Sequence, residues 1–382
     1  NYRLFLFGFL VADLMAAGAL SLEELKDRIP DTVYIRYGQE EGLQESLDIP
    51  LVTYPETIDV SDRGSYQIPC SLLGMLPLKT VQVETVEDQW VYVSGTTVGL
   101  YMETQGVLIV DTGEITNRNG MIQEPAANIV QPGDYILEVN GKPVSRKKEL
   151  IAEIENCQGQ DVELLVNRKG EEIPLSLAPV LTQEEDYKLG IWVRDNTQGI
   201  GTMTYVDEEG KFGALGHGIS DTDTGQLLDV SGGELYQAQI VSIIRGTQGV
   251  PGELSGYIEY EEEKKIGIIE KNTDIGIFGQ IFPGTQLAKE KVMIGYKQEV
   301  KEGKAQLLMQ SEGKTEKYDI EITEIYSSQQ DTNKSFQIQV TDPELLAKTG
   351  GIVQGMSGSP ILQDGKLIGA VTHVFVQDSA KG

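Results

Sequence analysis

Two glycine-rich segments carry the residue types that acyl transfer to a serine requires. Ser357 lies in the run Gly-Met-Ser-Gly-Ser-Pro at residues 355–360, and His217 lies between two glycines. Serine attacks a carbonyl at neutral pH only when a base takes its proton, and histidine is the usual base. Glycine beside the serine lets the backbone turn sharply and approach a substrate. The pattern predicts Ser357 as nucleophile, His217 as general base, and the N–H groups of Gly355 and Ser357 as the oxyanion hole.

Two other residues compete for these roles. Ser359 follows the predicted nucleophile by two positions, but Pro360 places it where a strand resumes, so Ser357 is preferred. His373 is the second of only two histidines and falls on a predicted strand over 367–376. A histidine in mid-strand is held close to the nucleophile's own hairpin. We therefore expect His373 near or beneath the specificity pocket as a polar packing residue, while the reverse assignment of the two histidines stays open.

An acid that orients the histidine is harder to assign from the residues alone. The order along the sequence, histidine before serine, fits a two-barrel β protease, in which an aspartate lies between them. Asp274 begins a predicted strand midway between His217 and Ser357 and would be the choice on that pattern. Asp221 and Asp223, close to the histidine, fall in a turn rich in Thr and Asp that looks exposed. They are weaker candidates.

The elements that must position these residues are mainly strands. The 382 residues include 43 glycines and 16 tyrosines, and many short Val/Ile/Thr runs predict a β-rich protein of two or three domains. The net charge of −28 excludes nucleic acid as an expected partner, because an acidic surface repels phosphate. Only two cysteines, Cys70 and Cys157, are present, too few for a disulfide framework or a four-ligand zinc site. No metal or phosphate motif occurs, so we expect neither a metal nor another cofactor.

The N-terminus contains an apolar stretch, Leu4 to Leu20, preceded by Arg3 and interrupted by Asp13. It is short for a spanning helix, so residues 1–20 are predicted to be a signal segment or membrane anchor; the alternative is a buried amphipathic helix. Residues 21–96 read as a β-rich N-terminal region. The abrupt ends of the sequence suggest truncation, at the C-terminus in particular.

Residues 97–180 resemble a PDZ domain of the type found with bacterial proteases. The most specific part is the run Gly-Asp-Tyr-Ile-Leu-Glu-Val-Asn-Gly at residues 133–141, followed by a predicted helix over 147–157. Such a domain binds the extended end of a polypeptide by adding it as a strand. We expect N–H groups near Gly99 and Leu100 to hold the carboxylate of that peptide. The alternative is a small α+β domain that only spaces its neighbours.

Residues 97–382 resemble the SpoIVB peptidase family of endospore-forming bacteria. The resemblance rests on Leu-Gly-His-Gly-Ile-Ser-Asp at 215–221, Gly-Gly-Ile-Val-Gln-Gly-Met-Ser-Gly-Ser-Pro at 350–360 and Gly-Ala-Val-Thr-His-Val-Phe-Val at 369–376. It implies a trypsin-like double β-barrel serine peptidase domain over residues 181–382, after the PDZ domain. It also implies His217 as base, Ser357 as nucleophile and Asp342 as the acid. Asp342 precedes Pro343, so from the residues alone it would equally suit a helix N-cap.

The same resemblance implies a function and a place. The expected protein is a self-cleaving serine endopeptidase, exported and anchored or associated with the forespore inner membrane, facing the intermembrane space. Its expected partner is a membrane-bound sporulation regulator whose cleavage leads to activation of the late mother-cell sigma factor. The PDZ ligand is expected to be its own N-terminal segment or the C-terminus of a protein. The alternative is a non-catalytic PDZ-type scaffold at the membrane, which fluorophosphonate labelling of Ser357 would distinguish from an enzyme.

Overall fold

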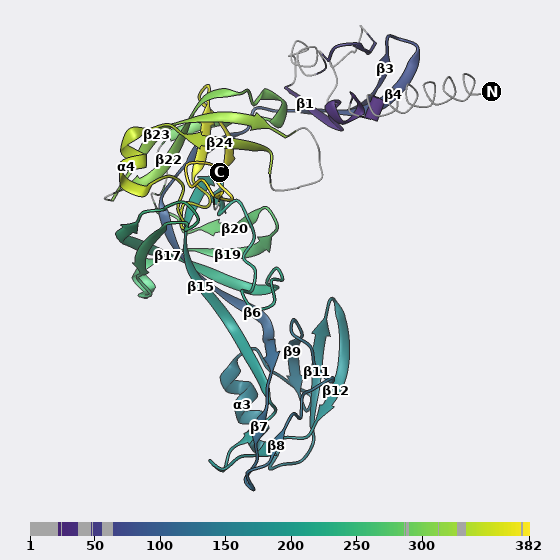
Figure 1. The fold of residues 1–382 in the computed structure, drawn as a ribbon, viewed down its shortest axis with the longest axis vertical. Coiled ribbons are helices and arrows are strands. Elements are labelled where there is room, and N and C mark those ends of the chain that lie inside the picture. Colours follow the sequence, from purple (N-terminus) through teal and green to yellow (C-terminus); the bar gives the residue numbers. More distant parts are fainter. Residues whose placement is uncertain are drawn as a thin grey trace, which may run out of the picture.

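The protein is elongated and built mainly of strands (Figure 1). The computed structural model describes residues 22–23, 25–36, 47, 49–55, 64–285, 287, 290–311, 313–326, 334–375 and 377–382. The predicted membrane segment, residues 1–20, lies outside these ranges. Of the helices within them, none is long and apolar enough to cross a membrane.

The N-terminal part is a four-stranded sheet in the order β1-β4-β3-β2. Its strands are β1 (Thr32–Arg36), β2 (Val52–Thr53), β3 (Ser65–Leu72) and β4 (Leu76–Val86). Successive side chains of a strand point to opposite faces, and Val33, Ile35, Val81 and Val83 are buried on one of them. The predicted β-rich N-terminal region is confirmed.

Six strands close into the first barrel, each paired with the next around the ring. In ring order they are β6 (Thr97–Thr112), β15 (Ile191–Val206), β16 (Lys211–Ala214), β20 (Gly276–Ile281), β19 (Lys265–Thr273) and β17 (Val230–Ile244). Leu100, Met203, Phe212 and Leu235 belong to its apolar core. β17 continues beyond the ring as a hairpin with β18 (Glu253–Ile258). The His217 loop begins directly after β16.

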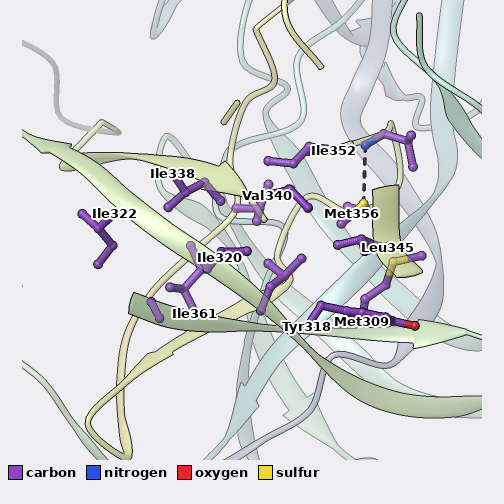
Figure 2. Packing of buried hydrophobic residues seen from close by; sticks show 14 of the residues in the cluster. Met309, Tyr318, Ile320, Ile322, Ile338, Val340, Leu345, Ile352, Met356 and Ile361 are labelled. Atoms are coloured by element: carbon purple, nitrogen blue, oxygen red, sulfur yellow. Dashed lines mark hydrogen bonds between the residues drawn. The ribbon is translucent and has the colours of Figure 1, made fainter. Parts of the chain in front are cut away.

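The second β unit surrounds the Ser357 loop. In pairing order its strands are β5 (Trp90–Val93), β21 (Glu290–Ile294), β26 (Lys366–Ala370), β25 (Pro360–Gln363), β22 (Gly303–Ser311), β23 (Lys314–Ile325) and β24 (Phe336–Val340). The short helix α4 (Pro343–Thr349) precedes the Ser357 loop, and one-turn 3₁₀ helices are η1 (Glu262–Lys264) and η2 (Lys297–Glu299). Figure 2 shows Met309, Tyr318, Leu345 and Met356 packed in the core of this unit. The two units together form a trypsin-like double barrel, which confirms the predicted fold class.

The PDZ domain is inserted between the two long strands of the first barrel. β6 and β15 leave the barrel side by side (Figure 1). They stay paired along their length, from Thr97 opposite Thr202 to Thr112 opposite Ile191. Their outer halves join the elements β9 (Tyr135–Val139), β11 (Val162–Arg168), β12 (Glu171–Leu177) and α3 (Lys147–Asn156), with the short strands β7 (Ile115–Thr116), β8 (Ile122–Gln123), β10 (Lys142–Pro143), β13 (Val180–Leu181) and β14 (Tyr187–Lys188). The buried carboxylate of Asp134, in the predicted Gly-Asp run, pairs with Arg168 at 2.7 Å. This pair fixes β9 against the end of β11.

The predicted domain boundaries at residues 97 and 181 cut through these continuous strands. Residues 98–102 pair with β15 and β17 inside the first barrel, whereas Ile191 and Val193 of β15 pack on the PDZ core. β5 belongs to the second β unit and not to the N-terminal region. The prediction of a PDZ domain followed by a separate peptidase domain is therefore corrected: the PDZ domain interrupts the first barrel.

Candidate active site

Ser357 lies in the loop between α4 and β25. Gly355 and Gly358 of this loop have left-handed backbone, with φ of +96° and +93°. A Cβ on Gly358 would lie 2.1 Å from the carbonyl oxygen of Thr202, so only glycine fits there. Met356 is fully buried in the core of the second β unit (Figure 2). The glycines and Met356 thus hold a half-buried Ser357 at the turn of the loop.

Strand β15 of the first barrel binds the carbonyl groups of this loop. The N–H of Thr202 donates to the Ser357 carbonyl at 3.0 Å, and the Thr202 hydroxyl donates to the Gly355 carbonyl at 2.7 Å. The Thr204 hydroxyl donates to the Gly358 carbonyl at 2.7 Å. The N–H groups of Gly355 and Ser357 donate to no acceptor in the described part of the protein. Fixed N–H groups of this kind are what an oxyanion hole requires.

His217 follows β16 on a left-handed turn, in which Leu215 and Gly216 have φ of +69° and +68°. The Leu215 N–H donates to the Thr202 carbonyl at 3.1 Å, so Thr202 also holds the start of the histidine loop. Nδ1 of His217 lies 2.8 Å from the carbonyl oxygen of Gly218. Because a carbonyl oxygen only accepts, Nδ1 carries the proton and the neutral ring keeps a lone pair on Nε2. This is the tautomer that a general base at Nε2 needs.

His217 and Ser357 line the same cavity, of about 300 Å³, where the first barrel meets the Ser357 loop. Gly355 and residues 197–200 of β15 line it too. Among the described residues no hydrogen bond joins the Ser357 hydroxyl to the imidazole. In free enzymes such bonds are often long and tighten when substrate binds. The structure thus brings the predicted nucleophile, base and oxyanion donors to one cavity.

His373 lies next to His217, with ring centroids 6.2 Å apart. The two histidines line a second cavity, of about 270 Å³, together with Thr372 and Asp274. Nδ1 of His373 is 2.8 Å from the Thr372 hydroxyl. His373 does not line the cavity of Ser357, so its expected effect on substrate preference stays a prediction.

Asp342 is the N-cap of α4. Its carboxylate accepts from the N–H groups of Glu344 at 2.9 Å, Leu345 at 3.1 Å and Asp319 at 3.2 Å. It lines neither of the two cavities that His217 lines. The contacts of Asp342 are therefore those of a helix cap, and its role as triad acid stays a prediction of the family resemblance.

The other aspartates considered from the sequence lie nearer the histidine loop. Asp274 shares the second cavity with His217, and its carbonyl oxygen accepts from the Gly218 N–H at 3.2 Å. Asp221 and Asp223 both pair with Arg194 of β15. Asp221 is 2% exposed, so the expectation of an exposed turn is wrong for this residue, because the guanidinium of Arg194 satisfies its charge.

Gly99 and Leu100 lie in the first barrel and not at a PDZ groove. Gly99 pairs with Ile200 on one side and with Tyr236 on the other, and Leu100 is buried in the barrel core. A residue with strands on both sides offers no open edge to the end of a peptide. The prediction that Gly99 and Leu100 hold a peptide carboxylate is therefore wrong.

The open sheet edge of the PDZ domain is the outer half of β15. Its residues 191–196 pair with β6, and no other described strand pairs with them in register. Helix α3 packs beside this half, and the Asp195 carboxylate accepts from the Lys147 N–H at 2.8 Å. An extended peptide can add as a strand at such an edge. A sequence signal for this peptide-binding edge is Leu189-Gly190-Ile191, an apolar-glycine-apolar run at the start of the strand, which the sequence-based prediction did not use. Gly190 in this run has a φ of +70°.

Comparison with known families agrees with this architecture. Residues 185–382, just over half of the protein, match the family model described as SpoIVB peptidase S55, and residues 121–168 match that of a PDZ domain. Among solved structures, the protein is similar to the PDZ domain of an SdrC-like protein from Listeria monocytogenes, with 19% identity, a TM-score of 0.19, and coverage of 23% of this protein and 87% of that one. The protein belongs to the SpoIVB peptidase S55 family and is a serine peptidase of sporulation that carries a PDZ domain.

Proposed function

We propose that this protein is a self-cleaving serine endopeptidase that acts outside the cytoplasm in sporulation signalling. The observation that carries the proposal is the cavity shared by His217 and Ser357, next to two N–H groups that donate to no described acceptor. Membership of the S55 family supports it.

In the proposed reaction, Ser357 Oγ attacks the scissile carbonyl carbon while Nε2 of His217 takes the hydroxyl proton. The N–H groups of Gly355 and Ser357 stabilise the negative oxygen of the tetrahedral intermediate. His217 then gives its proton to the leaving amine, and water activated by the same nitrogen hydrolyses the acyl-enzyme. The Gly218 carbonyl keeps the proton on Nδ1 throughout.

The proposed substrate is a membrane-bound sporulation regulator whose cleavage leads to activation of the late mother-cell sigma factor. The enzyme would face the intermembrane space, held at the forespore inner membrane by residues 4–20, whose apolar sequence supports an anchor. The open edge of β15 would take the PDZ ligand, which is the enzyme's own N-terminal segment or the C-terminus of a protein. A serine peptidase family model and a PDZ family model support a protein substrate and a peptide ligand.

Self-cleavage is tested by incubating the purified full-length protein and its Ser357→Ala variant and sequencing the new N-termini. The proposal predicts new N-termini between residues 20 and 95 that depend on Ser357. Adding active enzyme to the inactive variant tells cleavage between molecules from cleavage within one. Identical fragments from the isolated Ser357→Ala protein would mean that a contaminating protease makes them.

A further inference from the structure

The cavity that holds Ser357 has no carboxylate, ammonium or guanidinium group among its described lining residues. Its apolar lining includes Leu100, Met102, Leu215 and Ile219, and its polar lining includes Thr197, Gln198 and Gln354. None of the described residues that line it is Asp, Glu, Lys or Arg, although the protein has a net charge of −28. A concave, uncharged surface of this kind selects a ligand by shape and by the apolar area that it buries.

One position in the wall has no side chain. Gly199 of β15 lines the cavity, and no atom of a described residue lies within 4 Å of the place where its Cβ would be. Gly201 is two residues along the strand and so on the same face, and its Cβ would lie 2.0 Å from the side chain of Leu215. Because Leu215 also lines the cavity, Gly199 faces the open volume of the cavity. A side chain at position 199 would occupy that volume.

We propose that this cavity is a subsite for a substrate side chain next to the scissile bond, that it takes an uncharged apolar side chain such as Leu, Ile or Met, and that Gly199 determines this specificity. The inference rests on the proposed role of Ser357 as nucleophile. The reacting carbonyl must then lie between Ser357 Oγ and the N–H of Gly355, so a flanking residue reaches the same cavity.

The size and chemistry of the cavity fit this ligand. A volume of about 300 Å³ is at the small end of ligand sites and suits one aliphatic side chain with part of its backbone. A charged side chain would lose its water there and find no carboxylate, ammonium or guanidinium partner among the described lining residues, which is unfavourable.

The test uses internally quenched peptides that differ only at the two positions flanking the cleaved bond, with Leu, Met, Ala, Asp or Lys. The full-length wild type is compared with Gly199→Ala and Gly199→Leu. The control is Gly64→Leu, because Gly64 is an exposed residue of the N-terminal part whose Cβ would meet, among the described residues, only the Tyr66 ring, at 3.9 Å. At one flanking position, wild type is expected to prefer Leu or Met over Asp and Lys. Gly199→Leu should lower kcat/KM for the Leu peptide at least about tenfold relative to the Ala peptide, and Gly64→Leu should leave that ratio unchanged.

Two results would overturn the subsite: a wild-type preference for Asp or Lys at both positions, or an unchanged Leu-to-Ala ratio in folded Gly199→Leu. If Gly199→Leu does not fold, Gly199→Ala decides, because a single Cβ enters open space and should shift the ratio in the same direction by less. Fluorophosphonate labelling of Ser357 separates the two claims. An unlabelled wild type refutes the proposed function, whereas a labelled enzyme with an unchanged ratio refutes the subsite alone.

Discussion

Among single residues, the two histidines differ in what they contact, and this difference favours His217 as the base. His217 shares a cavity with Ser357 and presents Nε2 as its unprotonated nitrogen, whereas His373 contacts the Thr372 hydroxyl in the neighbouring cavity. We expect His217→Ala to lose turnover by on the order of 10⁴-fold or more. His373→Gln should keep turnover within about tenfold and change substrate preference. One altered side-chain contact in a substrate subsite changes the free energy of transition-state binding by only about 1–3 kcal/mol. Steady-state kinetics on a peptide set measures both, and loss of fluorophosphonate reactivity in folded His373→Gln, with His217→Ala still reactive, would reverse the assignment.

The cap contacts of Asp342 predict how its variants behave. Asn is as good an N-cap as Asp, whereas Ala loses the cap at a cost of about 1 kcal/mol. We therefore expect Asp342→Ala to lower the free energy of unfolding by about that amount and Asp342→Asn to retain stability, so that a loss of turnover in Asp342→Asn reports on catalysis and not on the cap. Denaturant unfolding and kcat of the two variants test this, with Asp274→Asn measured beside them. A folded Asp342→Asn enzyme with a loss on the order of 10⁴-fold in kcat would instead establish the triad role that the family implies.

The sequence predicts the reacting residues better than the residues that orient them. Ser357, His217 and Gly355 are candidates from the sequence because their types and glycine neighbours are local features, and the structure places all three around one cavity. The orienting groups depend on the folded backbone: the Gly218 carbonyl that binds Nδ1 has no sequence signature. An aspartate before a proline fits a helix cap and a triad acid equally well, so Asp342 could not be assigned by pattern alone.

Among elements, β15 connects the PDZ edge to the catalytic loop. Its outer half is the open edge, its residues 197–200 line the cavity of Ser357, and Thr202 binds the carbonyls of Gly355 and Ser357. The strand therefore positions the nucleophile loop through Thr202.

Removing the Thr202 hydroxyl should loosen that loop. Thr202→Val keeps the shape of the side chain but leaves the Gly355 carbonyl without its donor, at a cost of about 1–3 kcal/mol in unfolding free energy. We expect kcat to fall about tenfold with little change in KM, since a shifted oxyanion donor acts on the transition state. Thr202→Ser retains the hydroxyl and should restore kcat.

A control for this variant is Thr104→Val, which removes an equally buried hydroxyl bond, to the Gly106 carbonyl at 2.6 Å, away from the cavity. It should lose stability without a fall in kcat. If Thr202→Val and Thr104→Val lose kcat equally, or if Thr202→Ser fails to restore it, Thr202 has only a structural role.

The length of β6 and β15 could not be read from the sequence. Each has 16 residues, but glycines such as Gly106 and Gly199 interrupt the apolar pattern and resemble turn signals. In the structure Gly106 takes a φ of +96° inside its strand. Because each half reads as a separate short strand, the sequence pattern places Gly99 and Leu100 in the wrong domain.

At the scale of the whole molecule, an ion cluster fastens the N-terminal sheet to the second β unit. Arg36 of β1 donates to Glu299 of η2 at 2.9 Å, and Lys366 of β26 donates to the same carboxylate at 2.7 Å. Burial raises the pKa of Glu299, but the bonds from Arg36 and Lys366 outweigh it and lower this pKa to about 2. A carboxyl group with a lowered pKa stabilises the folded state above its unfolded pKa and loses this effect as the pH falls to the folded value.

Glu299→Gln should therefore destabilise the docked N-terminal sheet at pH 7, and the difference from wild type should shrink as the pH falls from 4.5 toward about 2. Hydrogen exchange of β1 and denaturant unfolding at several pH values measure this. The control is Glu185→Gln, because the Glu185 pair with Arg118 is well exposed and contributes little. A difference between wild type and Glu299→Gln that is independent of pH would show that this ion cluster does not hold the sheet.

The overall architecture was predictable in kind but not in arrangement. Alternating strands, the Gly-Asp run and the two glycine loops indicated a PDZ domain and a double barrel, and both are present. The insertion of the PDZ domain into the first barrel depends on pairing between residues far apart in sequence, such as Thr97 with Thr202. Local patterns carry no information about such pairs.

The central claim is that Ser357 is a nucleophile activated by His217, and fluorophosphonate labelling of the purified full-length protein tests it most directly. With the modified residue located by mass spectrometry, we predict one adduct, on Ser357, that persists in Ser359→Ala and is lost in His217→Ala. Ser359 is fully buried and has no hydrogen-bond partner for its hydroxyl among the described residues, so it should not react. An adduct on Ser359, or a folded wild-type protein that stays unlabelled, would contradict the account.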